Sequence, residues 1–511
     1  MPPVDLAVVP IVVNAGAALG PLLIAPIATF FGILFKPAAL LALLRRKPWL
    51  PVPIVLGGVG LYFLLAWAFA PAPAAAARGT AAANTSSLPI PEGDWTKLAL
   101  KLLRDEQFAA KTTGVKPVRE YNPEDGMMIL TCPATDAQGR IFAGAAIQDV
   151  GSYIGQLFAL DKDFQPLWKI EKHDDDDLKA FFSSPVLSLD GKSLIVGQGL
   201  HDDKDCALIC VDAATGAAKW KVQTPLHIES SPAVWNDLVV VGAGAIEDAN
   251  HKPTGDPGFV LGVQISTGKT LWKHAVNDPE SSPAIHPDDG TVYIGAGFNG
   301  NAVVALRPES DEDLKGAKRE LWRTAAPYPV TGPVTLAGDL VLVGGGTSDF
   351  VNVSPTPAGV VMALDRKTGQ VKWQTKTPDS VLGRIVVDRG VAYCPVLSGR
   401  ILAIDVATGK EIWSKQVAGT SLLKAGLAIT PAPARPTTPA VPATLFAVSA
   451  DGYLMLVSTA DGTVAEKHAL GAPGKASKKG LNLSTPTVRG ADVYVGSETG
   501  GLRHFRKIDS K

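Results

Sequence analysis

The chain has 511 residues, of which 46 % are hydrophobic, and its 48 basic and 49 acidic residues give a formal net charge of −1. This length is sufficient for one large folded domain together with additional segments. The balanced charge, without a basic stripe, argues against nucleic-acid binding. The 51 glycines and 40 prolines are typical of a chain with many turns, and they lack the strict period of a fibrous protein.

Two long uncharged segments lie near the N-terminus. Residues 6–35 and 48–77 contain no Asp, Glu, Lys or Arg, and each is longer than the ~20 apolar residues that cross a bilayer. Residues 36–48 between them carry Lys and Arg but no acidic residue, so the positive-inside rule predicts that this loop is cytoplasmic. We therefore expect residues 1–70 to form two transmembrane helices, which anchor the rest of the chain on the periplasmic, extracytoplasmic side of the cell membrane.

The second uncharged segment has an alternative interpretation. The basic residues 45–47, the apolar residues 50–70 and the Ala-rich residues 70–77 also follow the order of a signal peptide and its cleavage region. Cleavage would leave the remaining chain in the same compartment.

A linker and a helix are expected next. Residues 71–91, rich in Pro, Ala, Ser and Thr, predict a flexible linker. Residues 92–112 predict an amphipathic helix, with Asp94 as its N-cap and Trp95, Leu98 and Leu102 on one face. Such a helix packs on the following domain or, alternatively, on a membrane surface or a partner.

A repeated segment organises the remaining chain. Its clearest copy is Leu364–Trp373, with the sequence LDRKTGQVKW. In this copy Asp365 is suited to bind turn amides, and Gly369 can adopt the left-handed conformation that closes a hairpin. Successive copies, 40 to 52 residues apart, end at Trp168, Trp220, Trp272, Trp322, Trp373 and Trp413. Such a period is the signature of stacked supersecondary units.

Two further motifs complete each repeat. One is a short strand that opens with Ser/Thr-Pro, as in Ser183–Pro185, and the other is a strand that ends in Val-Gly or Ile-Gly, as in Val240–Gly242. Four short strands per period make one blade of a β-propeller. We therefore expect an all-β, eight-bladed propeller of four-stranded antiparallel blades in residues 113–511. The blades begin near Met127, Ser183, Ser230, Ser281, Thr331, Gly383, Gly426 and Ser484.

The last blade has room for only three strands. Val115–Tyr121, ahead of the first blade, is expected to supply the missing outer strand, so that the N- and C-terminal strands close the ring. Blade seven has no tryptophan and is interrupted by the Pro-rich residues 431–442. A seven-bladed ring is therefore the alternative.

Together these motifs resemble the repeat of the pyrroloquinoline-quinone (PQQ)-type propellers over roughly residues 116–508. This superfamily includes quinone-dependent alcohol dehydrogenases and BamB, a non-enzymatic scaffold of outer-membrane barrel assembly. The resemblance implies that the six repeated tryptophans are structural and dock neighbouring blades, each burying about 200 Å². It is specific for fold and not for function.

The features of the enzymatic relatives are missing from the sequence. Those relatives hold PQQ at the propeller axis with Ca²⁺ and an Asp base, and they usually carry a disulfide between adjacent cysteines. Here Cys132, Cys206, Cys210 and Cys394 include no adjacent pair, and we expect them to be small buried side chains. No acid matches the Ca²⁺ ligands or the base. We therefore predict no catalytic residue and no cofactor. A BamB-type lipoprotein anchor is not expected either, because no cysteine precedes Cys132.

Metal ligands are not expected from the spacing of residues. The acidic segments 173–177 and 202–205 lack the pattern of a Ca²⁺ loop and predict solvated turns. The eight histidines are scattered, with no pair at metal-ligand spacing.

Binding is instead expected at long loops on the face that carries the blade-to-blade connections. The loops joining the second and third strands of blades one, three and five are lengthened: Gln148–Gly155, Glu247–Gly258 and Ser348–Gly359. These features favour a membrane-anchored, BamB-like, non-enzymatic scaffold that binds protein partners in envelope or outer-membrane protein assembly. The alternative is a PQQ-dependent dehydrogenase with Ca²⁺ and an atypical cofactor site.

Overall fold

The computed structural model describes residues 114–507, apart from 125, 150–151, 202, 247–251, 431–442, 472–476 and 478. The chain divides into two compact units, Met1–Arg78 and Gly79–Lys511, and all described residues belong to the second. The expected transmembrane helices, linker and helix 92–112 therefore lie outside the described residues. Within the described part, no helix is both long and apolar enough to cross a bilayer.

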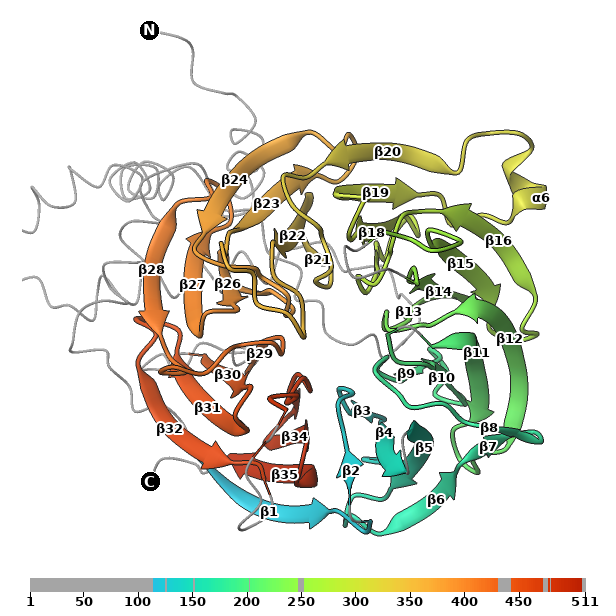
Figure 1. Cartoon of the computed structure of the whole chain (residues 1–511), viewed down its shortest axis with the longest axis horizontal. Helices are drawn as coiled ribbons and strands as arrows, with labels where there is room; N and C mark the ends of the chain where they lie inside the picture. The colour runs from blue at the N-terminus through green and yellow to red at the C-terminus, as the bar shows by residue number, and fades with distance from the viewer. Residues whose placement is uncertain are drawn as a thin grey trace, which may run out of the picture. The chain divides into compact units, whose positions relative to one another are not determined.

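Eight antiparallel sheets follow one another around a ring, so the eight-bladed prediction is confirmed (Figure 1). The first two blades comprise β2 (Met127–Met128), β3 (Ala134–Thr135), β4 (Ile141–Asp149), β5 (Ser152–Leu160) and β6 (Pro166–Ile170), then β9 (Val186–Leu187), β10 (Ser193–Gly197), β11 (Lys204–Asp212) and β12 (Ala218–Leu226). A two-stranded sheet, β7 (Lys172–His173) with β8 (Asp176–Asp177), lies between them. Blades three and four comprise β13 (Ala233–Trp235), β14 (Leu238–Ala243), β15 (Phe259–Gln264) and β16 (Thr270–Ala275), then β17 (Ala284–Ile285), β18 (Val292–Ala296), β19 (Ala302–Leu306) and β20 (Glu320–Ala325), with the short helix α6 (Asp311–Leu314) before β20.

The second half of the ring repeats this plan. Blades five and six comprise β21 (Thr335–Ala337), β22 (Leu340–Gly346), β23 (Gly359–Asp365) and β24 (Val371–Thr377), then β25 (Val386–Asp388), β26 (Val391–Val396), β27 (Arg400–Asp405) and β28 (Glu411–Gln416). Blades seven and eight comprise β29 (Ala428–Ile429), β30 (Thr444–Ser449), β31 (Tyr453–Ser458) and β32 (Val464–Ala469), then β33 (Thr487–Arg489), β34 (Asp492–Ser497) and β35 (Gly501–Lys507). Blade seven is thus a regular four-stranded blade although it has no tryptophan.

The ring closes through the N-terminal strand. β1 (Val115–Tyr121) pairs antiparallel with β35 and forms the outer strand of blade eight, which confirms the predicted closure. Each larger buried cluster of apolar side chains draws on two neighbouring blades, and the cluster between blades eight and one includes Tyr494 and Leu502 with Ile141 and Phe158. The hydrophobic core therefore lies between the blades.

The glycines of the Val-Gly motif make this close packing possible. A Cβ on Gly242 of β14 would lie 1.8 Å from the carbonyl oxygen of Pro279, in the connection to the next blade. A Cβ on Gly496 would likewise lie 2.4 Å from the carbonyl oxygen of Ile129. Since real Cβ atoms do not approach so closely, only glycine allows the backbone of the next blade to pass over these strands.

The turn of the repeat needs an Asp that binds backbone amides and a Gly that has a positive φ. Oδ1 of Asp365 accepts hydrogen bonds from the backbone N–H groups of Lys367 and Thr368, at 3.1 and 3.0 Å. A hydrogen bond from Lys372 and these backbone bonds lower the pKa of Asp365 to about 2. Gly369 has a φ of 71°, and a Cβ there would lie 2.6 Å from the ring of Trp322 in the preceding blade. The glycine is thus needed for the turn and for the contact with the tryptophan.

Candidate functional site

The six repeated tryptophans all lie at the boundary with the following blade. The indole Nε1 of each donates a hydrogen bond of 2.7 to 3.2 Å to a backbone carbonyl of that blade, from Trp168, Trp220, Trp272, Trp322, Trp373 and Trp413 to Ala213, Ile265, Pro308, Arg366, Val406 and Thr459, respectively. Five of the six rings also lie against the turn glycine of that blade, at Gly216, Gly268, Gly369, Gly409 and Gly462.

Two charged residues occupy the tryptophan position in the remaining blades. In blade seven, Glu466 pairs with Leu456 directly after the bulge, and its Oε2 accepts a hydrogen bond of 3.0 Å from the backbone N–H of Val115. In blade eight, Arg119 holds the equivalent position of β1 and forms an ion pair of 2.9 Å with Asp163 of blade one. Polar contacts therefore replace the indole on both sides of the closing blade.

A series of hydrogen bonds near the axis, here called the serine arc, connects blades one to four. The backbone N–H of Cys132, Ser184 and Ser231 donates to the hydroxyl oxygen of Ser184, Ser231 and Ser282, respectively, at 2.8 to 3.0 Å. The preceding serine of each pair donates its own hydroxyl to a carbonyl of the next blade, as Ser183 does to Ser230 at 2.9 Å. A serine suits both tasks because its hydroxyl is small and both donates and accepts.

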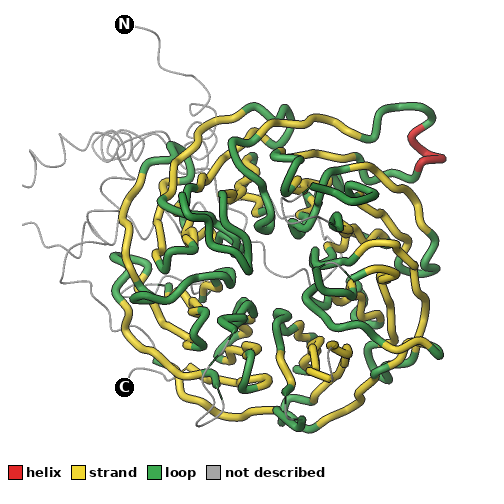
Figure 2. The backbone as a smooth tube through the Cα atoms, viewed as in Figure 1, coloured by secondary structure: helices red, strands yellow, loops and turns green. Residues whose placement is uncertain are grey.

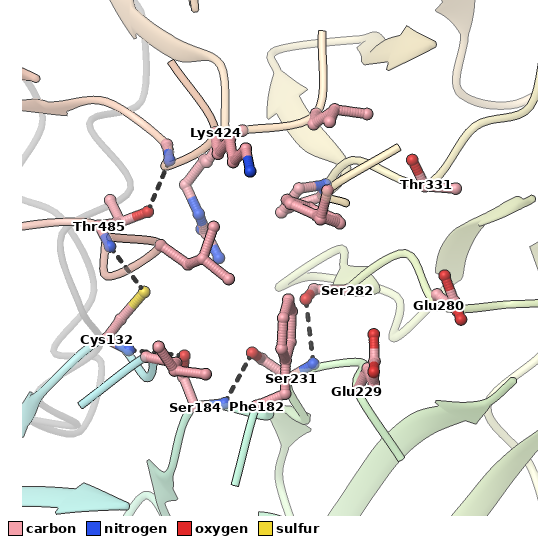
Figure 3. Close-up of a pocket in the computed structure, with 18 residues that line it drawn as sticks. Cys132, Phe182, Ser184, Glu229, Ser231, Glu280, Ser282, Thr331, Lys424 and Thr485 are labelled. Carbon is pink, nitrogen blue, oxygen red and sulfur yellow. Dashed lines mark hydrogen bonds between the residues drawn. The ribbon is translucent and has the colours of Figure 1, made fainter. Parts of the chain in front are cut away.

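Cys132 extends the serine arc to blades eight and seven. The N–H of Gly426 donates to the hydroxyl of Thr485 at 2.9 Å, and the N–H of Thr485 donates to Sγ of Cys132 at 3.3 Å (Figure 3). Thr131–Pro133 thus stands where other blades have Ser-Ser-Pro, a correspondence that is visible in the sequence. Of the four cysteines, the other three are buried and free, as expected, whereas Cys132 is half-buried.

The serine arc lines a small cavity on the axis, here called the axial cavity. Its volume is about 80 Å³, and loops surround the centre of the blade ring (Figure 2). Four charged side chains line it: Glu229 and Glu280 from the connections before blades three and four, and Arg384 and Lys424 from the connections before blades six and seven. Lys424 lies across the cavity from Glu229 (Figure 3). Lys424 is only 6 % exposed, and burial lowers its pKa although Asp349 and Glu498 oppose the shift.

The long loop of blade five reaches this cavity. Phe350 lines it and packs edge-on against Phe182 of the blade-two connection, with ring centroids 5.5 Å apart. Ser348–Gly359 therefore lies on the face of the blade-to-blade connections, as predicted. The prediction for Gln148–Gly155 is wrong: β4 and β5 remain paired as far as Asp149 and Ser152, because the strand pattern continues to the tip of this hairpin. Part of Glu247–Gly258 lies outside the described residues.

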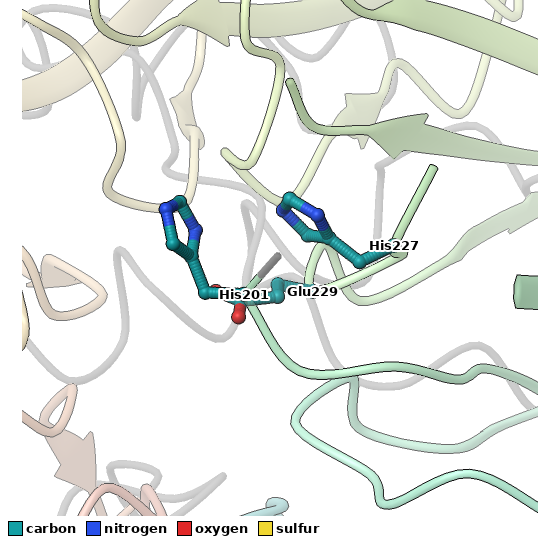
Figure 4. Close-up of side chains that lie close together, drawn as sticks. All are labelled: His201, His227 and Glu229. Carbon is teal, nitrogen blue, oxygen red and sulfur yellow. The ribbon is translucent and has the colours of Figure 1, made fainter. Parts of the chain in front are cut away.

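Two histidines and two glutamates, here called the His/Glu cluster, meet beside the axial cavity. Oε1 of Glu280 lies 3.1 Å from Nδ1 of His201 and 3.2 Å from Nε2 of His227, and the two imidazole centroids are 5.1 Å apart. Glu229 lies next to both rings (Figure 4). The histidines are 26 residues apart in different connections, so spacing alone did not reveal them.

Three residues of the cluster have pKa values that are shifted from their ordinary values. Burial raises the pKa of Glu280, but hydrogen bonds with His201 and His227 outweigh it and hold the pKa at about 2. Burial, followed by the charge of Glu280, raises the pKa of Glu229 to about 7. Burial lowers the pKa of His227, but the bond to Glu280 and the charge of Glu229 raise it above its ordinary value. Strongly shifted pKa values of this kind gather at functional sites.

The comparison with known families identifies the repeat. The family model described as outer membrane protein assembly factor BamB matches residues 153–313, 257–423 and 315–511, which together cover more than half of the chain. The chain belongs to the BamB family.

Relatives of this BamB-family chain include both assembly factors and dehydrogenases. A polyvinylalcohol dehydrogenase from Pseudomonas sp. is 25 % identical over 350 residues, 58 % of this chain and 47 % of that protein. An outer membrane protein assembly factor BamB from Nitrosomonas eutropha is 29 % identical over 149 residues, 29 % of this chain and 31 % of that protein. The chain thus spans about half or less of the length of these relatives. The crystal structure of BamB from Moraxella catarrhalis is 16 % identical with a TM-score of 0.53, covers 77 % of this chain and 100 % of that chain, and shows the fold alone.

The axial cavity is a poor match for the cofactors of quinoproteins in volume and in donor set. Sites for organic ligands have volumes of about 300–1,000 Å³, whereas this cavity has about 80 Å³. The donor set beside it includes two imidazoles, and Ca²⁺ prefers oxygen ligands. The enclosed volume is thus small for a tricyclic quinone, and two imidazoles are not the ligands that Ca²⁺ prefers.

Proposed function

We propose that the chain is a membrane-anchored, extracytoplasmic propeller that acts as a non-enzymatic protein-binding scaffold in envelope or outer-membrane protein assembly. The uncharged segments within residues 6–70 support the anchor and the compartment. Membership of the BamB family supports the scaffold. The partner is a polypeptide of the cell envelope.

The observation that carries the proposal is the apolar tip of the blade-five loop. Val351 and Val353 are 74 % and 51 % exposed, whereas the neighbouring Phe350 packs on Phe182. The loop is held by its own hydrogen bonds: Oδ1 of Asp349 accepts the N–H of Val351 at 2.6 Å. A pre-ordered loop loses little conformational entropy on binding, and its exposed valines supply apolar area for a partner.

Photocrosslinking tests this surface in the full-length chain in native membranes. A benzophenone amino acid at Val351 is expected to form a covalent adduct with an envelope polypeptide. The double variant V351D/V353D, tested with the benzophenone at Asn352, is expected to reduce this adduct by about tenfold, since a desolvated carboxylate disfavours an apolar contact.

The matched control is Leu189, which is 51 % exposed in the turn joining β9 and β10 on the opposite face. A benzophenone at Leu189 is expected not to give this adduct, and Leu189→Asp is expected to preserve the adduct formed from position 351. The proposal is wrong if position 351 gives no adduct, or if both faces give the same one.

A PQQ-dependent dehydrogenase is the alternative function. The observation that favours it is the 25 % identity to a polyvinylalcohol dehydrogenase over 58 % of this chain. The small volume of the axial cavity and the two imidazoles beside it argue against a quinone site.

A further inference from the structure

Three side chains of the His/Glu cluster have the arrangement of metal ligands. One ligand atom each of His201, His227 and Glu229 lies within 4.8 Å of the other two, the only such group of three or more among the described residues. His201 comes from the loop between β10 and β11, and the other two from the connection between β12 and β13. Two neighbouring blades therefore bring these side chains together, and the blade scaffold fixes their backbones.

Glu280 has the position of a supporting carboxylate. Metal-binding histidines usually present their second ring nitrogen to a carboxylate, which fixes the ring and its tautomer. Oε1 of Glu280 accepts from Nδ1 of His201 and from Nε2 of His227. One nitrogen of each ring belongs to the group of ligand atoms that lie within 4.8 Å of one another.

One ring nitrogen of the cluster lacks a hydrogen-bond partner. His227 is fully buried, and its Nδ1 is a buried atom without a hydrogen-bond partner in the structure. Buried polar atoms are nearly always paired, so an orphaned imidazole nitrogen beside a second imidazole and a carboxylate indicates a missing partner.

We propose that His201, His227 and Glu229 bind one divalent transition-metal ion of the zinc class, with Glu280 orienting both imidazoles. Imidazole nitrogen suits Zn²⁺ and its neighbours in the first transition row, and two His with one Glu is a three-ligand set that leaves a fourth position open. Glu229 and Glu280 also line the axial cavity, so a small ligand in that cavity can reach an ion held by Glu229.

The ligands must move only a little to form the site. A tetrahedral Zn²⁺ ion with bonds of about 2.0–2.1 Å places its ligand atoms about 3.3 Å apart. The three ligand atoms now lie up to 4.8 Å apart, so each pair must approach by about 1.5 Å or less. His201 can supply this shift because its side chain is 45 % exposed.

Calorimetric titration of the chelator-treated full-length protein with ZnCl₂ tests the proposal. We expect one equivalent of Zn²⁺ to bind, and we expect His201→Ala and Glu229→Gln each to weaken binding at least tenfold. Glu280→Gln is expected to weaken it by about 10- to 100-fold, the usual effect of losing a supporting carboxylate. With Co²⁺ as the probe, the visible absorption of a four-coordinate ion should appear in the wild type and be lost in His201→Ala.

His274→Ala is the matched control. His274 also bonds a carboxylate, that of Glu320 at 3.3 Å, but belongs to no three-ligand group among the described residues. Its replacement should leave Zn²⁺ binding unchanged. Because His201 is half-exposed, its variant is expected to fold even if substitution of the buried His227 prevents folding, and circular dichroism verifies this. Absence of Zn²⁺ binding to the wild type at millimolar concentration, or equal binding by wild type, His201→Ala and Glu229→Gln, would overturn the proposal.

Discussion

Replacing Trp272 by alanine is expected to lower the free energy of unfolding by about 3–5 kcal/mol, the usual cost of removing a large buried aromatic side chain. Trp272 is 1 % exposed, and its indole donates to the carbonyl of Pro308 in blade four at 3.1 Å. The guanidinium of Arg319 lies 4.7 Å from the ring centroid, and a Cβ on Gly262 would lie 2.1 Å from the ring. Loss of the ring would therefore leave a cavity between two blades. Urea denaturation followed by circular dichroism measures the change.

Two further variants separate the contributions of Trp272. Trp272→Phe keeps most of the ring and loses the hydrogen bond, so it should cost much less than the alanine variant, with about 1 kcal/mol coming from the lost bond. Trp235 also donates to a backbone carbonyl, that of Pro287 at 2.9 Å, but it is half-exposed. Trp235→Ala should therefore have less than half the effect of Trp272→Ala. A decrease of less than about 1 kcal/mol in the free energy of unfolding of Trp272→Ala would contradict the blade-docking role, because removing a buried indole usually costs more than this.

An internal deletion of residues 114–121 is expected to open the ring. These residues include β1, which covers β35 with a ladder from Val115–Lys507 to Tyr121–Leu502. The deletion also removes the contacts of Glu466 with Val115 and of Arg119 with Asp163. We expect the melting temperature to fall by at least about 10 °C, which corresponds to a loss of several kcal/mol. The exposed edge of β35 should also make the chain self-associate in size-exclusion chromatography.

Addition of the missing strand in trans provides the control. A synthetic peptide with the sequence of residues 114–121 should restore the monomer and much of the melting temperature, because an extended peptide can add to an open sheet edge. A scrambled peptide of the same composition should not. A deleted chain that remains monomeric and melts at the original temperature would show that β1 does not close the ring.

The fold could be predicted largely because each motif has a local physical cause. The Asp and Gly of the LDRKTGQVKW turn, and the glycine of each Val-Gly strand, act within a few residues of their own position. The bounds of β1 agree with the predicted Val115–Tyr121, which followed from the missing outer strand of the last blade. Blade seven forms although it lacks a tryptophan, because its turn glycine, Gly462, still receives Trp413 of blade six. The hairpin at Gln148–Gly155 differs from the prediction because its two strands stay paired as far as Asp149 and Ser152.

The candidate site was much harder to predict than the fold. Its residues belong to three separate connections, and no fixed spacing links His201 to His227 or to Glu280. One signal was present: Glu precedes Ser-Ser-Pro in blades three and four, at Glu229 and Glu280, where blade two has Phe182. Acids at two adjacent copies of an axial motif must converge once the blades close into a ring.

Titration of the purified full-length chain with PQQ and Ca²⁺ tests the central claim, a scaffold without quinone chemistry, most directly. The small axial cavity and its imidazole-rich donor set predict no saturable quinone binding and no dye reduction with alcohols, sugars or polyvinyl alcohol. Stoichiometric binding of PQQ accompanied by Ca²⁺-dependent dye reduction would contradict the claim and make the chain a dehydrogenase.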